Sequence, residues 1–306
     1  MSEQVYVVTG ASGNIGKILT GSLLKAGKKV RVIGRSSSRL QPLIDLGAQA
    51  AFGSLDDPEF LTEAFHGAKS VFAMIPPNIA AEDFRKYQGQ ISDSLVEAIR
   101  RSGVKNVVAL SSIGAHLPAG TGPIKGLFDF EQKLEKLEGA DVLILRPAFF
   151  MENLFQGASV IEQTGMNGAA LKPDTAPAMI ATNDIAEFAA DAMLNGKFKG
   201  VTAQVLLGPT DVSMLEATKA IGLAIGNPEL RYMQFPFENF RQAMASAGAS
   251  EDVINQYIEM IEWMNSGGSS NLVRTEQSST KTTIGEFAQR FAAVFKGTVA
   301  HAAGNN

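Results

Sequence analysis

The stretch Thr9-Gly10-Ala11-Ser12-Gly13-Asn14-Ile15-Gly16 follows directly on the apolar run Val5-Tyr6-Val7-Val8. That run is typical of a buried strand, because it is short, apolar and rich in valine. After the glycines, Ile15, Leu19 and Leu23 recur at every fourth position, which predicts one face of a helix. This part of the chain is therefore predicted to be a strand, a glycine-rich turn and a helix.

Each glycine of this turn suits a nucleotide diphosphate for its own reason. Gly10 can adopt the tight turn, and Gly13 lets the backbone approach a pyrophosphate without a Cβ in the way. Gly16 lets the helix pack closely on the strand, and the free N–H groups of the first helical turn face the anion. The context favours a dinucleotide site over the alternative, a tight strand-to-helix turn that holds nothing.

The end of the next predicted strand, at residues 29–33, indicates which dinucleotide binds. NAD-binding proteins place an Asp or Glu there for the ribose 2′-hydroxyl, whereas this chain has Arg35. Its guanidinium suits a 2′-phosphate, with Ser36 or Ser37 as hydroxyl donors and Arg39 as a second cation. NADP(H) is therefore predicted in preference to NAD(H). The alternative is that Arg35 is a solvated loop residue.

Up to about residue 150, short β-branched runs alternate with helical patterns. Strands are expected at residues 5–9, 29–33, 49–52, 70–75, 106–110 and 141–145, and helices near 14–26, 58–66, 83–102 and 125–137. The alternation predicts an α/β protein of the Rossmann type, with a doubly wound parallel sheet. In such a sheet the ligand binds at the carboxyl ends of the strands.

Beyond residue 150 the alternation is less regular. A helix capped by Asp184, a strand at 202–207, a helix after Ser213 and an extended segment at 234–237 are expected in that order. Helices at 240–247, 252–265 and 287–295, a loop at 266–270 and a frayed tail at 301–306 complete the prediction. We therefore expect a nucleotide-binding Rossmann domain at residues 1–150. A smaller C-terminal α/β lobe is expected at residues 151–306, with short crossings back to the sheet.

The composition excludes several classes of function. Of the 306 residues, 45% are hydrophobic and 19% are charged, a balance that supplies a globular core. The chain has no cysteine and only three scattered histidines, which excludes disulfides and predicts no metal site. A net charge of −4 with dispersed basic residues argues against direct binding of nucleic acid. No signal peptide and no membrane-spanning run is recognisable, so a cytoplasmic protein without a membrane partner is expected.

Two further motifs stand where strands are predicted to end. They are Leu110-Ser111-Ser112-Ile113-Gly114-Ala115 and Leu145-Arg146-Pro147-Ala148-Phe149-Phe150-Met151-Glu152-Asn153. With these, the glycine turn and Arg35, the chain resembles the NmrA-like group of atypical short-chain dehydrogenase/reductases over about residues 4–210. That group contains NADPH-dependent quinone and azo reductases, and also non-enzymatic proteins that sense NADP(H) and bind a partner protein. The resemblance implies a cofactor more firmly than a reaction.

The resemblance also implies which residues meet the cofactor. The pyrophosphate turn is lined by Gly10, Ser12, Gly13, Asn14, Ile15 and Gly16, and Arg35 with Ser36 meets the 2′-phosphate. Met74, Ile75 and Pro76 pass the nicotinamide ribose, and Pro147, Ala148 and Phe149 flank the nicotinamide ring. Gly53-Ser54-Leu55 has a serine where the group usually has an acid, which weakens any contact with adenine there.

The catalytic machinery departs from the wider superfamily. Ordinary members use a tyrosine with a lysine four residues later, where the lysine lowers the pKa of the tyrosine. None of the four tyrosines of this chain precedes a lysine by four, and Phe128 stands about where relatives often have histidine. Asp129 and Lys133 are four residues apart, so Lys133 is either a catalytic candidate or part of a helical ion pair.

Without such a tyrosine, the chemistry favours a quinone as hydride acceptor. General acid catalysis is typically worth about 10²–10⁴ in rate, so its loss is severe for a ketone that becomes a basic alkoxide. A quinone instead gives a phenolate-like anion with a pKa near 10, which water can protonate. Ser111 lies at the ligand-facing edge and is a candidate both for cofactor binding and for a hydrogen bond to a substrate oxygen.

Three functions remain after these observations. The first is an NADPH-dependent oxidoreductase that passes hydride to a quinone-like or azo acceptor, with Ser111 or a water as hydrogen-bond donor. The second is a non-catalytic redox sensor in which NADP(H) binding is read by a protein partner. A transcriptional regulator that binds DNA directly ranks last, because the chain has no helix-turn-helix signal.

Overall fold

The computed structural model describes the backbone of residues 4–303 and the side chains of residues 4–296. By its internal contacts the described chain divides into two units. Unit 1 comprises residues 4–119, 123–147 and 182–205, and unit 2 comprises residues 120–122, 148–181 and 206–303. Residues 1–3 and 304–306 lie outside the described part.

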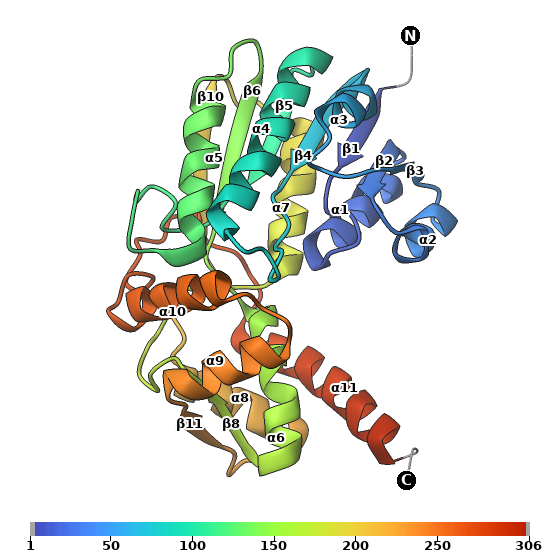
Figure 1. The fold of residues 1–306 in the computed structure, drawn as a ribbon. Coiled ribbons are helices and arrows are strands. Elements are labelled where there is room, and N and C mark those ends of the chain that lie inside the picture. Colours follow the sequence, from blue (N-terminus) through green and yellow to red (C-terminus); the bar gives the residue numbers. More distant parts are fainter. Residues whose placement is uncertain (1–3, 304–306) are drawn as a thin grey trace. The chain divides into compact units, whose positions relative to one another are not determined.

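Unit 1 is built around a parallel sheet with helices on both faces (Figure 1). Its strands are β1 (Val5–Val8), β2 (Lys29–Gly34), β3 (Gln49–Phe52), β4 (Ala68–Ala73), β5 (Asn106–Leu110), β6 (Asp141–Pro147) and β10 (Val201–Leu206, which ends at the border of unit 2). Its helices are α1 (Asn14–Lys25), α2 (Ser37–Asp45), α3 (Pro58–Phe65), α4 (Phe84–Ser102), α5 (Lys125–Glu135) and α7 (Thr182–Asn195). The strand order is β10-β6-β5-β4-β1-β2-β3, so the chain reverses direction across the sheet after β3. The predicted doubly wound parallel sheet is confirmed.

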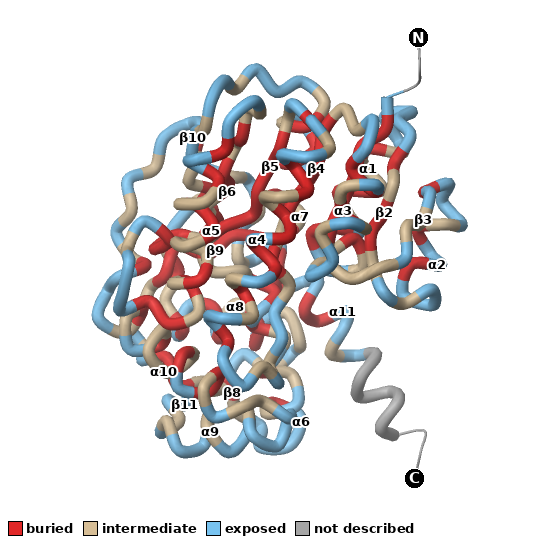
Figure 2. The backbone as a smooth tube through the Cα atoms, turned by 45° about the horizontal axis from the view of Figure 1, so that its top comes forward, coloured by how far each residue is buried: buried red, intermediate tan, exposed pale blue. Residues whose placement is uncertain are grey.

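The sheet of unit 1 is buried because its strands are apolar on both faces. Val7, Val71 and Val107 belong to one core cluster with the helices α3, α4 and α5. Val8 and Phe72 alternate with these residues and lie on the other face, where α1 and α7 pack. In Figure 2 the central strands are accordingly red, while the edge strand β3 is largely tan and blue.

Unit 2 contains shorter elements around a separate core. These are β7 (Phe149–Phe150), a 3₁₀ helix at Met151–Gly157, α6 (Ala158–Thr164), β8 (Met166–Ala169), β9 (Met179–Ile180), α8 (Met214–Ile225), β11 (Arg231–Gln234), α9 (Phe237–Ser246), α10 (Glu251–Asn265) and α11 (Ile284–Ala303). β7 pairs in parallel with β9, and β8 with β11. The core gathers Met151, Ile221, Met264, Phe287 and Phe291. A second short 3₁₀ helix, Gly122–Ile124, stands where the chain passes between the units.

The expected elements differ from the observed ones at several places, and β7, α6, β8 and β9 were not predicted at all. The helix Ser37–Asp45 was not predicted, because three serines and Pro42 resemble a loop, yet buried Leu40 and Leu43 hold it in place. Asp184 lies inside the first turn of α7 and does not cap it. Phe237 begins α9 and is not extended. Residues 301–303 continue α11 and are not a frayed tail, and residues 304–306 lie outside the described part.

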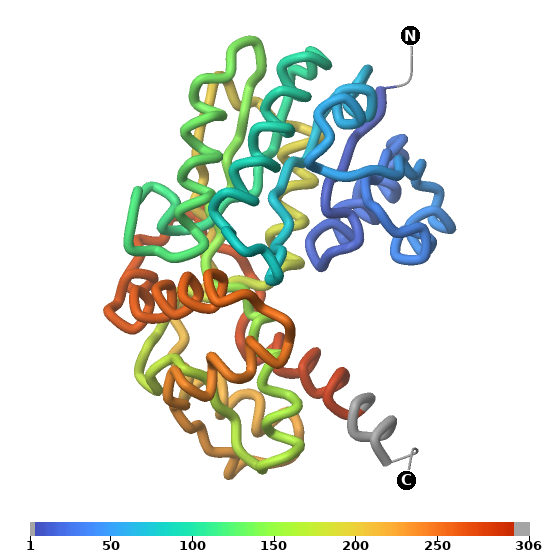
Figure 3. Tube along the Cα trace, in the orientation of Figure 1, coloured from blue at the N-terminus to red at the C-terminus, as the bar shows by residue number. Residues whose placement is uncertain are grey.

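The expected division at residue 150 also differs from the observed one. Residues 182–205 belong to unit 1, where α7 packs on α1 and β10 lies beside β6. In Figure 3 this yellow segment lies among the blue and green elements of unit 1. The sequence predicted short crossings from the second lobe back to the sheet, but it did not predict that residues 182–205 belong to unit 1, because sequence patterns are local.

Candidate functional site

Five of the parallel strands end side by side at one edge of the sheet in unit 1. Along this carboxyl edge the order is β6, β5, β4, β1 and β2. The residues at these five ends are Pro147, Ser111, Met74, Gly10 and Arg35, in the same order. Neighbouring strands lie about 4.8 Å apart, so the edge extends about 19 Å from β6 to β2. Residues predicted for one cofactor from separate motifs therefore follow one another along a single edge.

The glycine turn after β1 has the backbone geometry that its sequence predicts. Gly10 has a φ of +60°, in the left-handed region that favours glycine. A Cβ on Gly16 would lie 2.3 Å from the carbonyl oxygen of Gly10, so only glycine lets α1 approach the turn this closely. The amide of Gly13 donates to the carbonyl of Gly10 at 3.0 Å, which closes the turn.

The first turn of α1 is suited to an anion. Gly13 is the N-cap and has no side chain with which to cap the helix, and the first turn contains no acidic residue. By contrast, Asp57 and Asp83 are the N-caps of α3 and α4, and their carboxylates accept from backbone amides. Amides at a helix start that no side chain caps, together with the positive end of the helix dipole, attract a phosphate.

The predicted residues of this turn divide by exposure. Gly13 and Asn14 are exposed and Ser12 is half-buried, so all three are accessible to a ligand. The side chain of Ile15 is buried in the interior of unit 1, so this residue contributes to the site through its backbone.

The end of β2 combines a cation with a capped helix start. Arg35 is exposed, and Ser36 is the N-cap of α2, where its Oγ accepts from the amide of Arg39 at 3.4 Å. The Oγ atoms of Ser36 and Ser38 are 3.0 Å apart. An exposed arginine at the end of β2 is thus followed directly by two hydroxyls at the start of the nine-residue helix α2, a combination that suits a phosphate monoester.

Thr9, which the sequence analysis did not single out as a site residue, joins the ends of β1 and β4. Its buried Oγ1 donates to the carbonyl of Phe72 and accepts from the amide of Met74, each at 3.0 Å. This fixes Met74 beside the glycine turn, where a Cβ on Gly10 would lie 2.5 Å from the Met74 sulfur. The position of Thr9, at the first residue after β1, is the signal that identifies it.

The loop after β4 is held by a tyrosine. Tyr87 on α4 donates its hydroxyl to the carbonyl of Pro76 at 3.1 Å, and its ring stacks on Phe84. Burial raises the pKa of Tyr87 above its ordinary value, while the positive charge of Arg35 acts in the opposite direction. Ile75 is buried and Pro76 is half-buried. The predicted stretch from Met74 to Pro76 is therefore held at Met74 by Thr9 and at Pro76 by Tyr87.

Ser111, at the end of β5, belongs to a buried cluster with two residues that the sequence analysis did not select. Its hydroxyl donates to a carboxylate oxygen of Glu131 on α5. Arg146 on β6 binds the same carboxylate, with Nε 3.1 Å and 3.2 Å from its two oxygens and Nη2 closer to the second. Glu131 raises the pKa of Arg146 by its hydrogen bonds and its charge. The sequence signal that could have identified this cluster is Glu131 itself, a charged residue between the apolar residues of a predicted helix.

Lys133 contacts α4 instead of the carboxyl edge. Its Nζ lies 3.1 Å from the carbonyl of Gly89, 2.7 Å from the Oγ of Ser92 and 2.7 Å from the carboxylate of Asp93. An ammonium has three protons, and these three acceptors take all of them. The geometry gives Lys133 a packing role between two helices and does not support the predicted catalytic role.

The alternative expected for Lys133, a helical ion pair with Asp129, is wrong, because each of the two residues pairs with a residue of α4 instead. Asp129 accepts from Nε and Nη2 of Arg85 on α4 at 2.7 Å and 2.9 Å, while Lys133 pairs with Asp93. Arg85 lowers the pKa of Asp129 below its ordinary value. Both residues of α5 therefore join this helix to α4.

The motif after β6 carries the chain from unit 1 into unit 2. Pro147 ends β6 in unit 1, where its carbonyl accepts from the amide of Ile113 at 3.0 Å. Ala148 and Phe149 begin the part of unit 2 that follows, and their amides donate to Leu206 at 2.9 Å and Ala178 at 3.0 Å. The predicted nicotinamide residues thus belong to two units.

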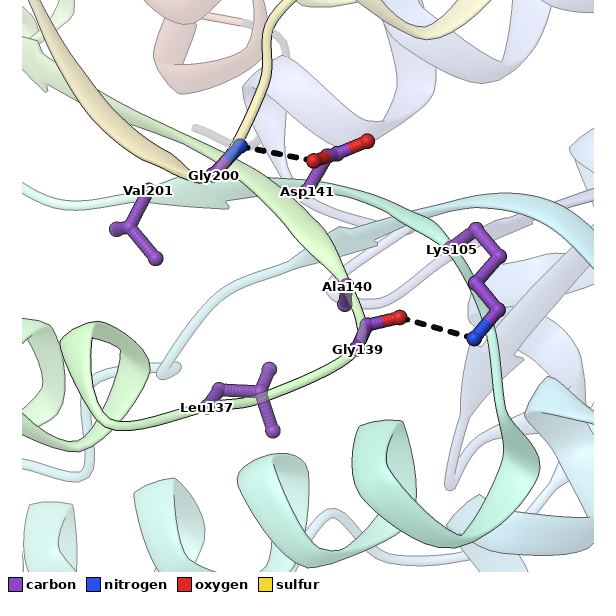
Figure 4. A pocket seen from close by; sticks show the side chains of 7 residues that line it. All are labelled: Lys105, Leu137, Gly139, Ala140, Asp141, Gly200 and Val201. Carbon is purple, nitrogen blue, oxygen red and sulfur yellow. Dashed lines mark hydrogen bonds between the residues drawn. The ribbon is translucent and has the colours of Figure 1, made fainter.

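A hollow of about 310 Å³ in unit 1 lies away from all the predicted residues (Figure 4). It is formed where β5 and β6 begin, at the opposite edge of the sheet, by Lys105, Leu137, Gly139, Ala140, Asp141, Gly200 and Val201. Asp141 accepts from the amide of Gly200 at 2.8 Å and Lys105 donates to the carbonyl of Gly139 at 3.0 Å, so its polar groups bind each other. These bonds join loops, and the hollow is not part of the candidate site.

Two kinds of feature are absent from the described residues. No group of three histidine, aspartate or glutamate side chains there is placed to hold a metal ion. None of the described helices combines the length and the apolar character that crossing a membrane requires.

Comparison with known proteins identifies the family. The model of the NmrA-like family matches residues 2–288, so the chain belongs to the NmrA-like family, as its motifs predicted. A curated relative, the NAD(P)H azoreductase of Xenophilus azovorans, is 27% identical over 294 residues, covering 95% of this chain and 99% of the relative.

Two solved structures share the fold at low identity. The NADPH-dependent quinone oxidoreductase QOR2 of Escherichia coli, complexed with NADPH, has a TM-score of 0.78 at 18% identity, covering 93% of this chain and 99% of that one. The triphenylmethane reductase of Citrobacter sp., complexed with NADP(H), has a TM-score of 0.78 at 19% identity, covering 94% and 99%. At this identity the two structures support the fold alone.

Proposed function

We propose that this chain is an NADPH-dependent oxidoreductase that transfers hydride to a flat aromatic acceptor, a quinone or an azo compound. The observation that carries this proposal is the order of residues along the carboxyl edge of the sheet. Arg35 for a 2′-phosphate, the glycine turn for a diphosphate, and Ser111 with Pro147 for the nicotinamide occur in the order in which an extended NADP(H) presents these groups. The name of the curated azoreductase relative points to the same reaction class.

The residues of the edge fit the cofactor on structural grounds. The turn has a left-handed Gly10 and a close approach at Gly16, and the start of α1 lacks both a side-chain cap and an acid. A carboxylate at the tip of β2 would bind a 2′-hydroxyl, whereas Arg35 carries the charge that a 2′-phosphate requires. When bound, the reduced nicotinamide supplies the hydride.

The protein contributes orientation and electrostatics in this proposal. The glycine turn holds the diphosphate and Arg35 holds the 2′-phosphate. Thr9 and Tyr87 fix the loop after β4, and β4 lies between β1 and β5 in the sheet. Such positioning converts a bimolecular hydride transfer into an effectively unimolecular one. No tyrosine of this chain has a lysine four residues later, so the proton is left to water. This suits a quinone, whose reduced anion has a pKa of about 10.

A second function, a redox sensor that binds NADP(H) without turnover, is favoured by one observation. Lys133, the candidate partner for proton transfer, is bound to Gly89, Ser92 and Asp93 on α4. A sensor would transmit the binding of NADP(H) to a protein partner.

Steady-state assays distinguish the two functions. Purified protein, NADPH and a panel of quinones and azo dyes are mixed, and the absorbance of reduced nicotinamide is followed. The oxidoreductase predicts acceptor-dependent oxidation above the rate without protein. The sensor predicts that NADPH binds in calorimetry and that no acceptor increases its oxidation.

A further inference from the structure

The cluster of Ser111, Glu131 and Arg146 joins three elements at the nicotinamide end of the carboxyl edge. Glu131 is 2% exposed and Ser111 is 4% exposed, so this hydrogen bond is shielded from water. The three residues come from the end of β5, from the middle of α5 and from the penultimate position of β6. Ser111 is further fixed by its amide, which donates to the carbonyl of Leu145 at 2.7 Å.

The cluster determines which way the hydroxyl of Ser111 points. Arg146 binds both oxygens of Glu131, and a guanidinium is always protonated in proteins. A guanidinium can only donate, so both oxygens of Glu131 accept hydrogen bonds from Arg146. The same carboxylate accepts a further hydrogen bond, which the hydroxyl of Ser111 donates.

A serine hydroxyl has one proton and two lone pairs. In Ser111 that proton is taken by Glu131, which leaves only lone pairs for a ligand. A ligand atom that binds this oxygen must therefore be a hydrogen-bond donor. The oxygen of a quinone is only an acceptor, so it is not a partner for Ser111 in this arrangement.

We propose that Glu131 fixes Ser111 as a hydrogen-bond acceptor, and that Ser111 binds a donor group on the nicotinamide half of NADPH and not the oxygen of the substrate. The donor is the carboxamide N–H or a ribose hydroxyl, which share this chemistry. Glu131 is then a positioning residue that acts through Ser111. This inference rests on the proposed function, because it places the nicotinamide at this end of the edge. It also assigns one role to Ser111, for which the sequence allowed two.

The test measures the affinity for NADPH by calorimetry, together with the affinity for adenosine 2′,5′-bisphosphate, which lacks the nicotinamide half. Ser111→Ala is expected to weaken NADPH binding about 2- to 12-fold, the worth of one neutral hydrogen bond, and to leave the bisphosphate unaffected.

The NADPH analogue with an acetyl group in place of the carboxamide identifies the donor. If Ser111→Ala weakens NADPH but not the analogue, the donor is the carboxamide. If the variant weakens both equally, the donor is a ribose hydroxyl. Both results support the acceptor role of Ser111.

Glu131→Gln tests the positioning step. The amide oxygen of Gln faces Arg146, so its NH₂ group donates to Ser111 and turns the serine proton toward the ligand. We expect NADPH affinity to fall at least as far as in Ser111→Ala. In the Ser111→Ala background the same change is expected to add less than about twofold, since Glu131 acts through Ser111. Glu97→Gln, at an exposed pair with Arg100, is the matched control.

Two results would overturn the inference. One is a loss of about 10²- to 10³-fold in kcat for Ser111→Ala with unchanged NADPH affinity, which would show that Ser111 donates to the reacting oxygen. The other is an undiminished effect of Glu131→Gln in the Ser111→Ala background. If Glu131→Gln does not fold, Ser111→Ala alone decides. The binding measurements hold even if no acceptor is turned over, so failure of the proposed function is recognised separately.

Discussion

Arg35 is the residue on which the choice of cofactor depends, and Arg35→Ala tests it. The guanidinium is exposed at the end of β2, beside the Ser36 cap of α2. A hydrogen bond to a charged group is worth about 1.5–3 kcal/mol, and each 1.4 kcal/mol is tenfold in affinity. Because Arg35 is exposed to solvent, we expect one such contribution and not two. NADPH affinity should therefore fall about 10- to 100-fold.

The assay is calorimetric titration of NADPH and NADH with the wild type and with Arg35→Ala. NADH lacks the 2′-phosphate, so its affinity is expected to change less than about threefold. Arg100→Ala is the matched control, because it removes an exposed arginine charge from α4 without touching the edge. Equal losses for NADPH and NADH in Arg35→Ala would refute the 2′-phosphate assignment.

Three further predictions concern the turn and the α4–α5 contacts of unit 1. Gly16→Ala places a Cβ 2.3 Å from the carbonyl oxygen of Gly10. We therefore expect the free energy of unfolding, measured in urea, to fall by about 1–3 kcal/mol, and NADPH to bind more weakly. Unchanged NADPH affinity would show that the turn does not hold the cofactor. Lys133→Met should lower stability by about 1 kcal/mol or less and leave kcat within about twofold, whereas a fall of 10²-fold would restore its catalytic role. Arg85 lowers the folded pKa of Asp129, so this pair stabilises above pH 4 or so, and the gain is lost as pH falls through the folded pKa. Asp129→Asn should therefore flatten the urea midpoint against pH in that acidic range, and an unchanged profile would contradict the assignment.

The parts of the site that the sequence predicted are those encoded locally. The glycine turn requires residues within eight positions, and their spacing reports both the left-handed backbone at Gly10 and the close approach at Gly16. Arg35 was likewise recognisable, because it follows a strand directly. The order of these motifs along one edge then follows from the general rules for parallel sheets.

The parts that the sequence did not predict depend on contacts between distant segments. Glu131 and Arg146 lie 15 positions apart and meet Ser111 only after α5 and β6 have packed. The same holds for Lys133, whose partners on α4 lie about 40 positions earlier in the chain. Residue type and spacing alone favoured an ion pair within one helix, because an Asp four residues before a Lys lies on the same helical face.

Two segments were mispredicted because the sequence features next to them along the chain were misleading. Ser37–Asp45 contains Pro42, which removes a helical hydrogen bond, yet the Ser36 cap and two buried leucines stabilise the helix. Residues 182–205 followed the motif after β6 and were assigned to the second lobe, although α7 packs on α1. Packing of an apolar helix face overrides both signals.

The reaction that we propose is the oxidation of NADPH by a quinone-like acceptor. The most direct measurement is the acceptor-dependent loss of absorbance of reduced nicotinamide, with NADPH and NADH compared in parallel and heat-denatured protein as the control. We expect oxidation by quinones well above the control, and faster with NADPH than with NADH. Tight binding of NADPH without oxidation by any quinone or azo dye would contradict it.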